Sequence, residues 1–327
     1  MATPGRGSDM DSEVSSKQRV VCLIGVASGL GVPEAGRSGS GRAGAALEEA
    51  DVVAGMRRNR VACAWDQPIA ASPDTLLPRD SALRLLCGQI EERVAARIAG
   101  GALPVVAGGD HAMAVGTWRG AGRALGQPLG LLWIDAHLDA HTGLSSPSGN
   151  AHGMPLAALL GQGPNPWEGT AAAVDASRCC VFGARSYEEP EWLLLQHLGV
   201  NIVTMDEIRR RGLPQALDAA LAHVAGGSFG ISIDLDAVDP PDAPAVNTPS
   251  AHGLDGAALV DALRGVAHNP QLVAIEIAEY NPERDVAGKT ARLVAALLES
   301  LTAPGGAGPA CDTPLKHARG NNWIQKL

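Results

Sequence analysis

Residues Leu129 to His141 read LGLLWIDAHLDAH, an apolar run that ends in alternating carboxylates and imidazoles. The apolar part is continuous, which is typical of a strand that is covered on both faces. Side chains at every second position of an extended segment point the same way, so we expect Asp135, His137 and Asp139 to converge. The stretch therefore predicts a buried strand whose carboxyl end carries ligand-type side chains, with His141 next in line.

Apolar runs of this kind alternate with helical patterns along the chain. The expected strands are Val20–Val26, Leu103–Ala107, Leu129–Asp135, Arg178–Phe182, Val200–Met205, Ser228–Asp234 and Leu272–Ile277. The expected helices are Ala82–Ala99, Ala112–Ala124, Pro190–Leu198, Leu213–Ala225, Asp255–Val266 and Ala287–Leu301. The alternation predicts a single α/β domain in which a parallel sheet has helices on both faces.

Two terminal segments fall outside this pattern. Residues 1–18 are polar and rich in Gly and Ser, so we expect a loose N-terminal tail before the main domain at residues 19–302. The run Ala303-Pro304-Gly305-Gly306 breaks any helix. Residues 303–327 are therefore expected to form a C-terminal extension on the surface.

Composition narrows the possible classes of protein. The 327 residues are 46% hydrophobic, which supports a sizeable core, and the formal net charge is −9. This charge argues against nonspecific binding of nucleic acid and is compatible with a cationic substrate. No apolar run reaches the roughly 18 residues of a membrane span. The six cysteines form no CxxC pair and no secretory signal precedes them, which predicts reduced thiols in a cytoplasmic protein.

Three more polar clusters follow expected strands, as ligand sites do in open α/β sheets. They read GGDH at residues 108–111, SIDLDAVD at 232–239 and EIAEYNP at 276–282. Taken alone, His111 near a helix start is more often structural, and Asp234 and Asp236 could belong to a capped turn.

The charge of the combined clusters favours a metal centre over these separate explanations. Asp135, Asp139, Asp234 and Asp236 would bring four negative charges into one cleft, which is costly unless cations neutralise them. Two divalent ions would do so, with His111 and His137 completing a ligand set of oxygen and nitrogen atoms. Such a set fits manganese best and leaves iron, cobalt and nickel open. Two ions about 4 Å apart can share one water molecule and lower its pKa towards ~7.

The motifs GGDH, DAHLD, SGNAHG, SIDLDAVDP and EIAEYNP, in this order, resemble those of the arginase/agmatinase (ureohydrolase) family from Val20 to Leu301. The resemblance implies a ureohydrolase catalytic domain with three α-β-α layers and a mostly parallel central sheet of about eight strands. It implies that one Mn²⁺ is held by His111, Asp135, Asp139 and Asp234. It implies that the second is held by His137, Asp135, Asp234 and Asp236.

The same resemblance implies three catalytic roles. Asp139 would also accept a hydrogen bond from the attacking hydroxide, and Glu279 would bind the substrate guanidinium through a charge-assisted pair. His152 would protonate the leaving amine, for which an imidazole is suited. The reaction implied is the hydrolysis of a guanidino group to urea and an amine.

The loop after DAHLD distinguishes between substrates of this family. Arginases carry a Ser-Gly-Asn-x-His-Gly stretch, matched here by residues 148–153, which predicts hydrolysis of L-arginine to L-ornithine and urea. Agmatine or a guanidinobutyrate-type acid is the alternative. The expected substrate-binding residues are His141, Ser148, Asn150, Glu188, Glu191 and Thr248, with Glu188 or Glu191 receiving an α-amino group.

Two departures from the family pattern bear on this prediction. His141 stands where arginases usually carry the asparagine that binds the substrate carboxylate, and an imidazole can still donate to that group. Asn247 stands where family members usually carry glycine, so we expect it to hold a left-handed turn.

Rival interpretations concern other classes of protein. Residues Gly39 to Gly44 match the dinucleotide fingerprint G-x-G-x-x-G, although a long loop separates them from the expected strand at Val20–Val26. A catalytically inactive regulatory subunit is the other rival, and the complete set of ligand types argues against it. The family resemblance also implies a homo-oligomer, a trimer or a hexamer.

Overall fold

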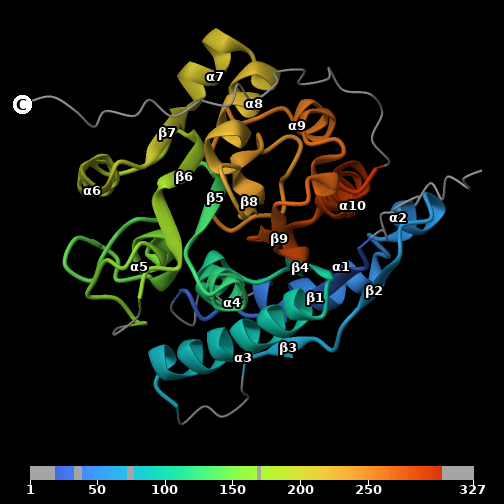
Figure 1. Ribbon diagram of the computed structural model, residues 1–327, viewed down its shortest axis with the longest axis horizontal. Helices are drawn as coiled ribbons and strands as arrows, with labels where there is room; N and C mark the ends of the chain where they lie inside the picture. The colour runs from blue at the N-terminus through green and yellow to red at the C-terminus, as the bar shows by residue number, and fades with distance from the viewer. Residues whose placement is uncertain (1–18, 33–38, 72–76, 168–170, 304–327) are drawn as a thin grey trace, which may run out of the picture.

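The computed structural model describes residues 19–32, 39–71, 77–167 and 171–303, in which strands and helices alternate along the chain (Figure 1). The strands form one sheet in the order β2-β1-β4-β9-β8-β5-β6-β7, with β3 pairing beside β1. Every pairing between them is parallel. The strands are β1 (Val21–Ala27), β2 (Cys63–Trp65), β3 (Ile69–Ala70), β4 (Leu103–Ala107), β5 (Leu129–Ile134), β6 (Val174–Ala184), β7 (Asn201–Thr204), β8 (Phe229–Asp234) and β9 (Leu272–Ala278).

Strand β5 shows why its run of apolar residues is unbroken. Its residues are all buried, and successive side chains enter different cores. Leu132 and Ile134 belong to one hydrophobic cluster, whereas Leu131 and Trp133 belong to the other. Because side chains alternate across a strand, both faces of the sheet must be covered, as the sequence predicts.

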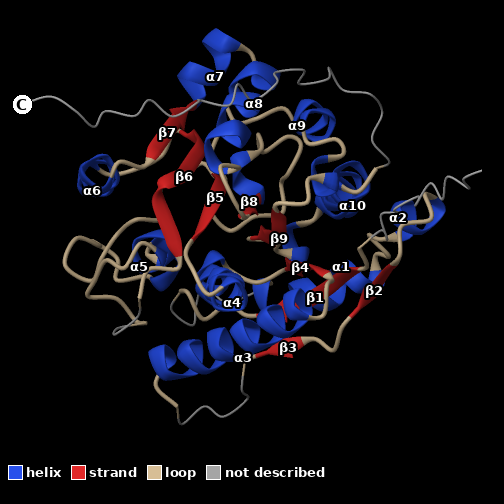
Figure 2. Ribbon diagram, viewed as in Figure 1, coloured by secondary structure: helices blue, strands red, loops and turns tan. Residues whose placement is uncertain are grey.

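Helices supply the two covering layers (Figure 2). One cluster takes residues from α3, α4, α5 and α6, and the other from α1, α2, α7, α8, α9 and α10. The predicted three-layer α-β-α fold with a parallel sheet is thus confirmed. The helices are α1 (Ala43–Glu49), α2 (Ala54–Arg58), α3 (Arg79–Ala99), α4 (Ala114–Leu125), α5 (Pro155–Leu159), α6 (Glu189–Leu198), α7 (Met205–Arg211), α8 (Leu213–Val224), α9 (Gly256–Ala262) and α10 (Lys289–Leu301).

Several element boundaries differ from the sequence-based prediction. Helix α10 begins at Lys289 because Ala287 has a φ of 54°, outside the right-handed helical region. Helix α9 ends at Ala262, before Gly265 with a φ of 72°. The short strands β2 and β3 and the short helices α2, α5 and α7 are absent from the prediction, and α1 was expected only as part of a helical stretch at Ala45–Gly55. Pieces of this length carry too little periodicity to be recognised.

The expected N-terminal tail and almost all of the C-terminal extension lie outside the described residues. Within the described ranges the sheet and its helices run from β1 to α10 without a second sheet. The cysteines in those ranges are free thiols, as expected, and Cys311 lies beyond them. None of the helices in the described part of the chain is long and apolar enough to cross a bilayer.

Candidate metal centre and substrate pocket

The ligand-type side chains lie at the carboxyl ends of neighbouring strands. Strands β4, β9, β8 and β5 are adjacent in that order, and their ends lead into the four polar clusters. Parallel strands present their carboxyl ends at one edge of the sheet, so residues far apart in sequence meet there. The fold therefore brings together His111, Asp135, His137, Asp139, Asp234, Asp236 and Glu279.

Local structure explains how the GGDH motif presents His111. Gly108 and Gly109 have φ values of 104° and 69°, which an L side chain rarely adopts. Asp110 then caps the 3-10 helix His111–Met113 by accepting a hydrogen bond from Ala112 N. The two glycines and the cap together make a sharp turn. The 3-10 helix that follows begins at His111, whose side chain is 1% exposed at the edge of the sheet.

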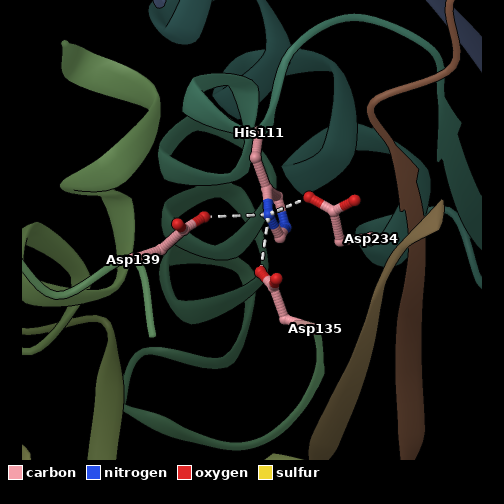
Figure 3. Close-up of side chains that lie close together, drawn as sticks. All are labelled: His111, Asp135, Asp139 and Asp234. Atoms are coloured by element: carbon pink, nitrogen blue, oxygen red, sulfur yellow. Dashed lines mark ion pairs between the residues drawn. The ribbon is translucent and has the colours of Figure 1, made fainter. Parts of the chain in front are cut away.

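The imidazole of His111 faces three carboxylates (Figure 3). Its Nδ1 lies 3.0 Å from an oxygen of Asp234, 3.1 Å from one of Asp139 and 3.2 Å from one of Asp135. Although these oxygens are close, Nδ1 is buried and makes no hydrogen bond. An imidazole nitrogen directed at converging oxygens, without a hydrogen bond to any of them, is the arrangement expected around a cation.

A second group of ligand atoms shares Asp135 with the first. His137 Nδ1 lies 3.2 Å from Asp236 Oδ2 and 3.5 Å from Asp135 Oδ1, while the other oxygen of Asp135 faces His111. Asp234 belongs to the first group only. Asp234 also caps the 3-10 helix Leu235–Ala237 by accepting from Asp236 N at 2.8 Å. The carboxylate therefore takes part in the capped turn and in the ligand cluster at the same time.

The protonation of this centre shows that it requires positive charge. Burial and then neighbouring carboxylates raise the pKa of Asp234, and the same causes raise that of Asp236 to about 6. Burial opposes a charge on His137, but Asp236 and Asp135 raise its pKa to about 12. Protons on these groups would offset part of the negative charge of the carboxylates. Carboxylate and imidazole donors without sulfur suit two hard or borderline divalent ions, so the residues fit such ions.

Two residues at the site have backbone conformations that are rare for residues other than glycine. Asp139 has a φ of 48° and Glu279 a φ of 65°. Main-chain hydrogen bonds hold both, from Leu156 N to Asp139 O and from Glu279 N to Gly109 O, each at 2.9 Å. Strain of this kind persists where the surrounding structure imposes it, and it gathers at functional sites.

Glu279 is 2% exposed and lies between the metal-ligand candidates and His152. Its Oε1 accepts from the main-chain N of His111 at 2.9 Å and lies 3.6 Å from His152 Nδ1. Burial opposes a charge on His152, but the Glu279 carboxylate raises its pKa to about 9. The pair therefore consists of a carboxylate and an imidazolium near neutral pH.

The expectation for Asn247 is wrong. Asn247 is not among the residues with positive φ, so it does not hold a left-handed turn. Its Nδ2 donates to Ser40 Oγ at 2.6 Å and to Glu279 Oε2 at 3.4 Å, and its Oδ1 accepts from Asn281 at 2.7 Å. The amide therefore links Glu279 to the turn at Ser40, which a glycine could not do.

A cavity of about 300 Å³ joins these groups to the expected substrate-binding residues. Its lining includes His141, Ser148, His152, Glu188, Glu191, Thr248 and Glu279 together with ligand candidates of both groups. Asn150 is not in this lining; its main-chain N donates to Ser148 Oγ at 3.2 Å. The pocket thus has carboxylates and imidazoles at the metal end and two further glutamates at the far end.

Both ring nitrogens of His141 contact protein groups. Nδ1 lies 3.1 Å from Ser145 Oγ, and Nε2 lies 3.0 Å from Glu188 Oε2 and 3.3 Å from Glu191 Oε2. Burial and then the nearby Glu188 raise the pKa of Glu191 to about 8. With these contacts in place His141 has no nitrogen left for a substrate carboxylate.

The fingerprint at residues 39–44 serves packing. A Cβ on Gly44 would lie 2.8 Å from Val26 N, so this glycine lets α1 approach β1 closely. A Cβ on Gly39 would lie 1.7 Å from Asn281 Oδ1. Residues 33–38, just before the motif, lie outside the described ranges.

No role was predicted for Arg185 from the sequence. Its position directly after β6 is the one feature of the sequence that could have indicated a role. Its guanidinium donates to main-chain carbonyls of Gly183, Asp236, Ala237, Ser250 and Ala251. The bond to Asp236 O is 2.7 Å long, so Arg185 fixes the turn that carries Asp236. Such a contact depends on tertiary structure.

The parallel sheet and its edge of shared carboxylates and imidazoles define an α/β protein with a candidate binuclear metal centre. The Arginase family model matches residues 19–303, and the chain belongs to this family of hydrolases, whose members depend on a binuclear metal centre.

Individual relatives support this assignment. An arginase of Bacillus caldovelox is 34% identical over 294 residues, which cover 86% of this chain and 97% of that protein. The crystal structure of an arginase from Bacillus cereus superposes with a TM-score of 0.80 at 30% identity, covering 88% of this chain and 99% of that one. A formiminoglutamase of Trypanosoma cruzi, solved with Mn²⁺, shares the fold with a TM-score of 0.71 at 20% identity, covering 89% and 95% of the two chains.

Proposed function

We propose that this protein hydrolyses L-arginine to L-ornithine and urea. The observation that carries the proposal is one pocket lined by Glu279, His152 and both groups of ligand-type side chains. A guanidinium bound to Glu279 would lie beside the metal centre, with an acid nearby for the leaving amine.

The ion-holding residues are proposed as two overlapping sets. His111, Asp135, Asp139 and Asp234 would hold one ion, and His137, Asp135, Asp234 and Asp236 the other. Two divalent ions, when bound, would lower the pKa of a water molecule towards ~7 and so supply a nucleophile at neutral pH. Manganese is proposed from the donor types and from its presence in the related formiminoglutamase.

The chain's own residues would perform the remaining steps. Glu279 would pair with the guanidinium through charge-assisted hydrogen bonds and orient its carbon towards the nucleophile. A carboxylate oxygen of Asp139 would accept a hydrogen bond from the attacking water and take up its proton. His152, whose pKa is raised to about 9, would be protonated at neutral pH and donate to the leaving amine.

Residues at the far end of the pocket would select the substrate by its length and charge. Glu188 and Glu191 would receive the α-amino group, and Ser148, Asn150 and Thr248 would remain as polar partners of the carboxylate. Because both ring nitrogens of His141 contact Ser145 and these glutamates, His141 is the weakest of the expected carboxylate ligands.

Agmatine is the second candidate because it shares the ammonium group and lacks the carboxylate. Glu188 and Glu191 would attract that ammonium just as well. A guanidinobutyrate-type acid would instead bring a lone carboxylate towards the charged Glu188, which disfavours it through repulsion of like charges.

A urea-release assay with manganese tests the proposal over arginine, agmatine, 4-guanidinobutyrate and guanidine. Urea from arginine with the highest kcat/KM is expected. Urea from agmatine but not arginine would overturn the substrate assignment. Absence of urea from all four would overturn the activity and favour an inactive regulatory subunit. From the family relationship we also propose a cytoplasmic homo-oligomer, a trimer or hexamer, which analytical ultracentrifugation can measure.

A further inference from the structure

Glu276 is a buried carboxylate to which the proposed reaction assigns no role. It lies on β9 directly opposite Ser232 of β8 and is 0% exposed. Ser232 Oγ donates to Glu276 Oε1 at 2.8 Å, and Thr117 Oγ1 of α4 donates to the other oxygen. Burying a carboxylate costs several kcal/mol unless it is paired, so a polar residue at this depth requires an explanation.

The hydrogen bond to Glu276 decides what Ser232 can offer to His111. Ser232 Oγ lies 2.9 Å from His111 Nε2. A serine hydroxyl has one proton, and here it is committed to the carboxylate, so Oγ can only accept from the imidazole. Nε2 must therefore carry a hydrogen. In a neutral imidazole this leaves the lone pair on Nδ1, the nitrogen that faces the three carboxylates.

The plane of the His111 ring is fixed as well as its tautomer. The ring stacks on Trp133, with centroids 4.1 Å apart and an interplanar angle of 14°. Trp133 Nε1 in turn donates to Asp135 Oδ2 at 2.8 Å. Stacking restricts tilt of the imidazole, and the contact with Ser232 restricts its rotation within the plane, so Nδ1 is held in one direction.

We propose that Glu276 and Ser232 form a relay that holds His111 as a metal ligand, which makes both of them positioning residues for one ion of the pair. The inference rests on the proposed function, in which His111 binds one ion and His137 the other. Partners behind a histidine ligand fix its tautomer and increase its basicity. His137 has a different environment: its side chain is 22% exposed, and its Nδ1 faces Asp135 and Asp236. The relay therefore acts on one ion selectively.

Calorimetric titration of metal-depleted protein with MnCl₂ tests the relay without an activity assay. We expect the wild type to bind two ions. In Ser232→Ala and Glu276→Gln the dissociation constant of one ion rises by about 10- to 100-fold, while that of the other stays unchanged. Ser300→Ala is the matched control, since Ser300 is a buried serine whose hydroxyl donates to Val260 O. It leaves both dissociation constants at their wild-type values.

Every other result of this titration would overturn either the relay or the proposed function. Wild-type dissociation constants for both ions in Ser232→Ala and Glu276→Gln would overturn the relay while leaving the metal centre intact. Equal weakening in Ser300→Ala would overturn it too, because the effect would then reflect general loss of stability. If Ser232→Ala does not fold by circular dichroism, Glu276→Gln alone decides whether the relay exists, since the amide keeps the carboxylate's volume and removes the negative charge behind Ser232 and His111. A wild type that binds no ion would overturn the proposed function itself.

Discussion

His141 Nε2 lies 3.0 Å from Glu188 Oε2, and this contact directs an imidazole of the pocket towards the protein's own carboxylate. Its Nδ1 is occupied by Ser145, and Glu191 lies on its other flank. The far end of the pocket is therefore lined with glutamates that a neighbouring imidazole holds in position. A substrate reaching this end meets the negative charge of Glu188, whose pKa is lowered by its contacts with Glu191 and His141, and this charge favours an ammonium group.

Glu188→Gln tests this charge at the substrate's far end. The amide keeps the size of the side chain and an acceptor for His141 but removes the negative charge. We expect KM for arginine and for agmatine to rise about tenfold, because a charge-assisted hydrogen bond contributes about 1.5–3 kcal/mol when buried and less when exposed. The kcat value should change little, since Glu188 does not touch the guanidino group.

Glu189→Gln is the control for this variant. Glu189 is the next residue, is exposed, and is not part of the pocket lining. Its KM values should equal those of the wild type. A Glu188→Gln enzyme with unchanged KM for both cationic substrates would show that the glutamate does not recognise their ammonium group.

Asp234→Ala should remove bound metal and activity together. Asp234 Oδ2 lies 3.0 Å from His111 Nδ1, and its other oxygen caps the turn that carries Asp236. Elemental analysis is expected to find less than the wild-type metal content, with urea release reduced to background. Asp206→Ala, which removes an exposed carboxylate on α7, should retain both. Full metal content in Asp234→Ala would contradict its assignment as a ligand.

Metal binding should release protons. In the metal-free site the pKa of His137 is raised to about 12, so its imidazole is protonated at neutral pH, and burial and neighbouring carboxylates raise the pKa of Asp234, so its carboxylate holds a proton to higher pH than usual. A metal ion must displace these protons, and the dissociation constant therefore rises as the pH falls, by about tenfold per pH unit for each proton displaced. Calorimetry in buffers of different ionisation enthalpy counts the protons. A dissociation constant that is the same at pH values of about 6 and about 8 would rule this coupling out.

Gly230 is expected to tolerate no side chain. A Cβ there would lie 2.0 Å from Trp118 Cζ3, and Trp118 is fully buried. Gly230→Ala should therefore lower the free energy of unfolding by about 1–3 kcal/mol, the usual cost of overpacking a core. Gly88→Ala is the counterpart, because nothing lies within 4 Å of its Cβ on the exposed side of α3. It should raise stability by up to about 1 kcal/mol through helix propensity. Equal melting temperatures for the two variants would contradict the packing argument.

Much of the fold follows from local sequence patterns. The run Leu129–Ile134 and its counterparts are uninterrupted because helices cover both faces of the sheet. The predicted strands match observed ones to within one or two residues, except that the strand predicted at Arg178–Phe182 begins at Val174 and ends at Ala184. The short strand Cys63–Trp65 was not predicted. It is held by pairing with β1, a partner distant in sequence, and its three residues carry no period of their own.

The candidate site also has features that the sequence predicted and features that it did not. The residues of GGDH, DAHLD and SIDLDAVDP could be named from the sequence, because carboxylates and imidazoles after buried strands need partners. The contacts of Asn247 with Ser40 and with Glu279 could not be predicted from the sequence. Each depends on how separate loops approach one another.

The pattern of apolar runs and polar strand ends by itself determined the layered α/β architecture. It also determined which side chains lie at the edge of the sheet, since the spacing of apolar residues is a local property of the sequence. Only the tertiary structure decided how those side chains are arranged. The register of β8 against β9 sets Ser232 beside Glu276, and the approach of α6 brings Glu188 and Glu191 to His141. Such pairings arise from contacts between segments far apart in sequence, and no local pattern encodes them.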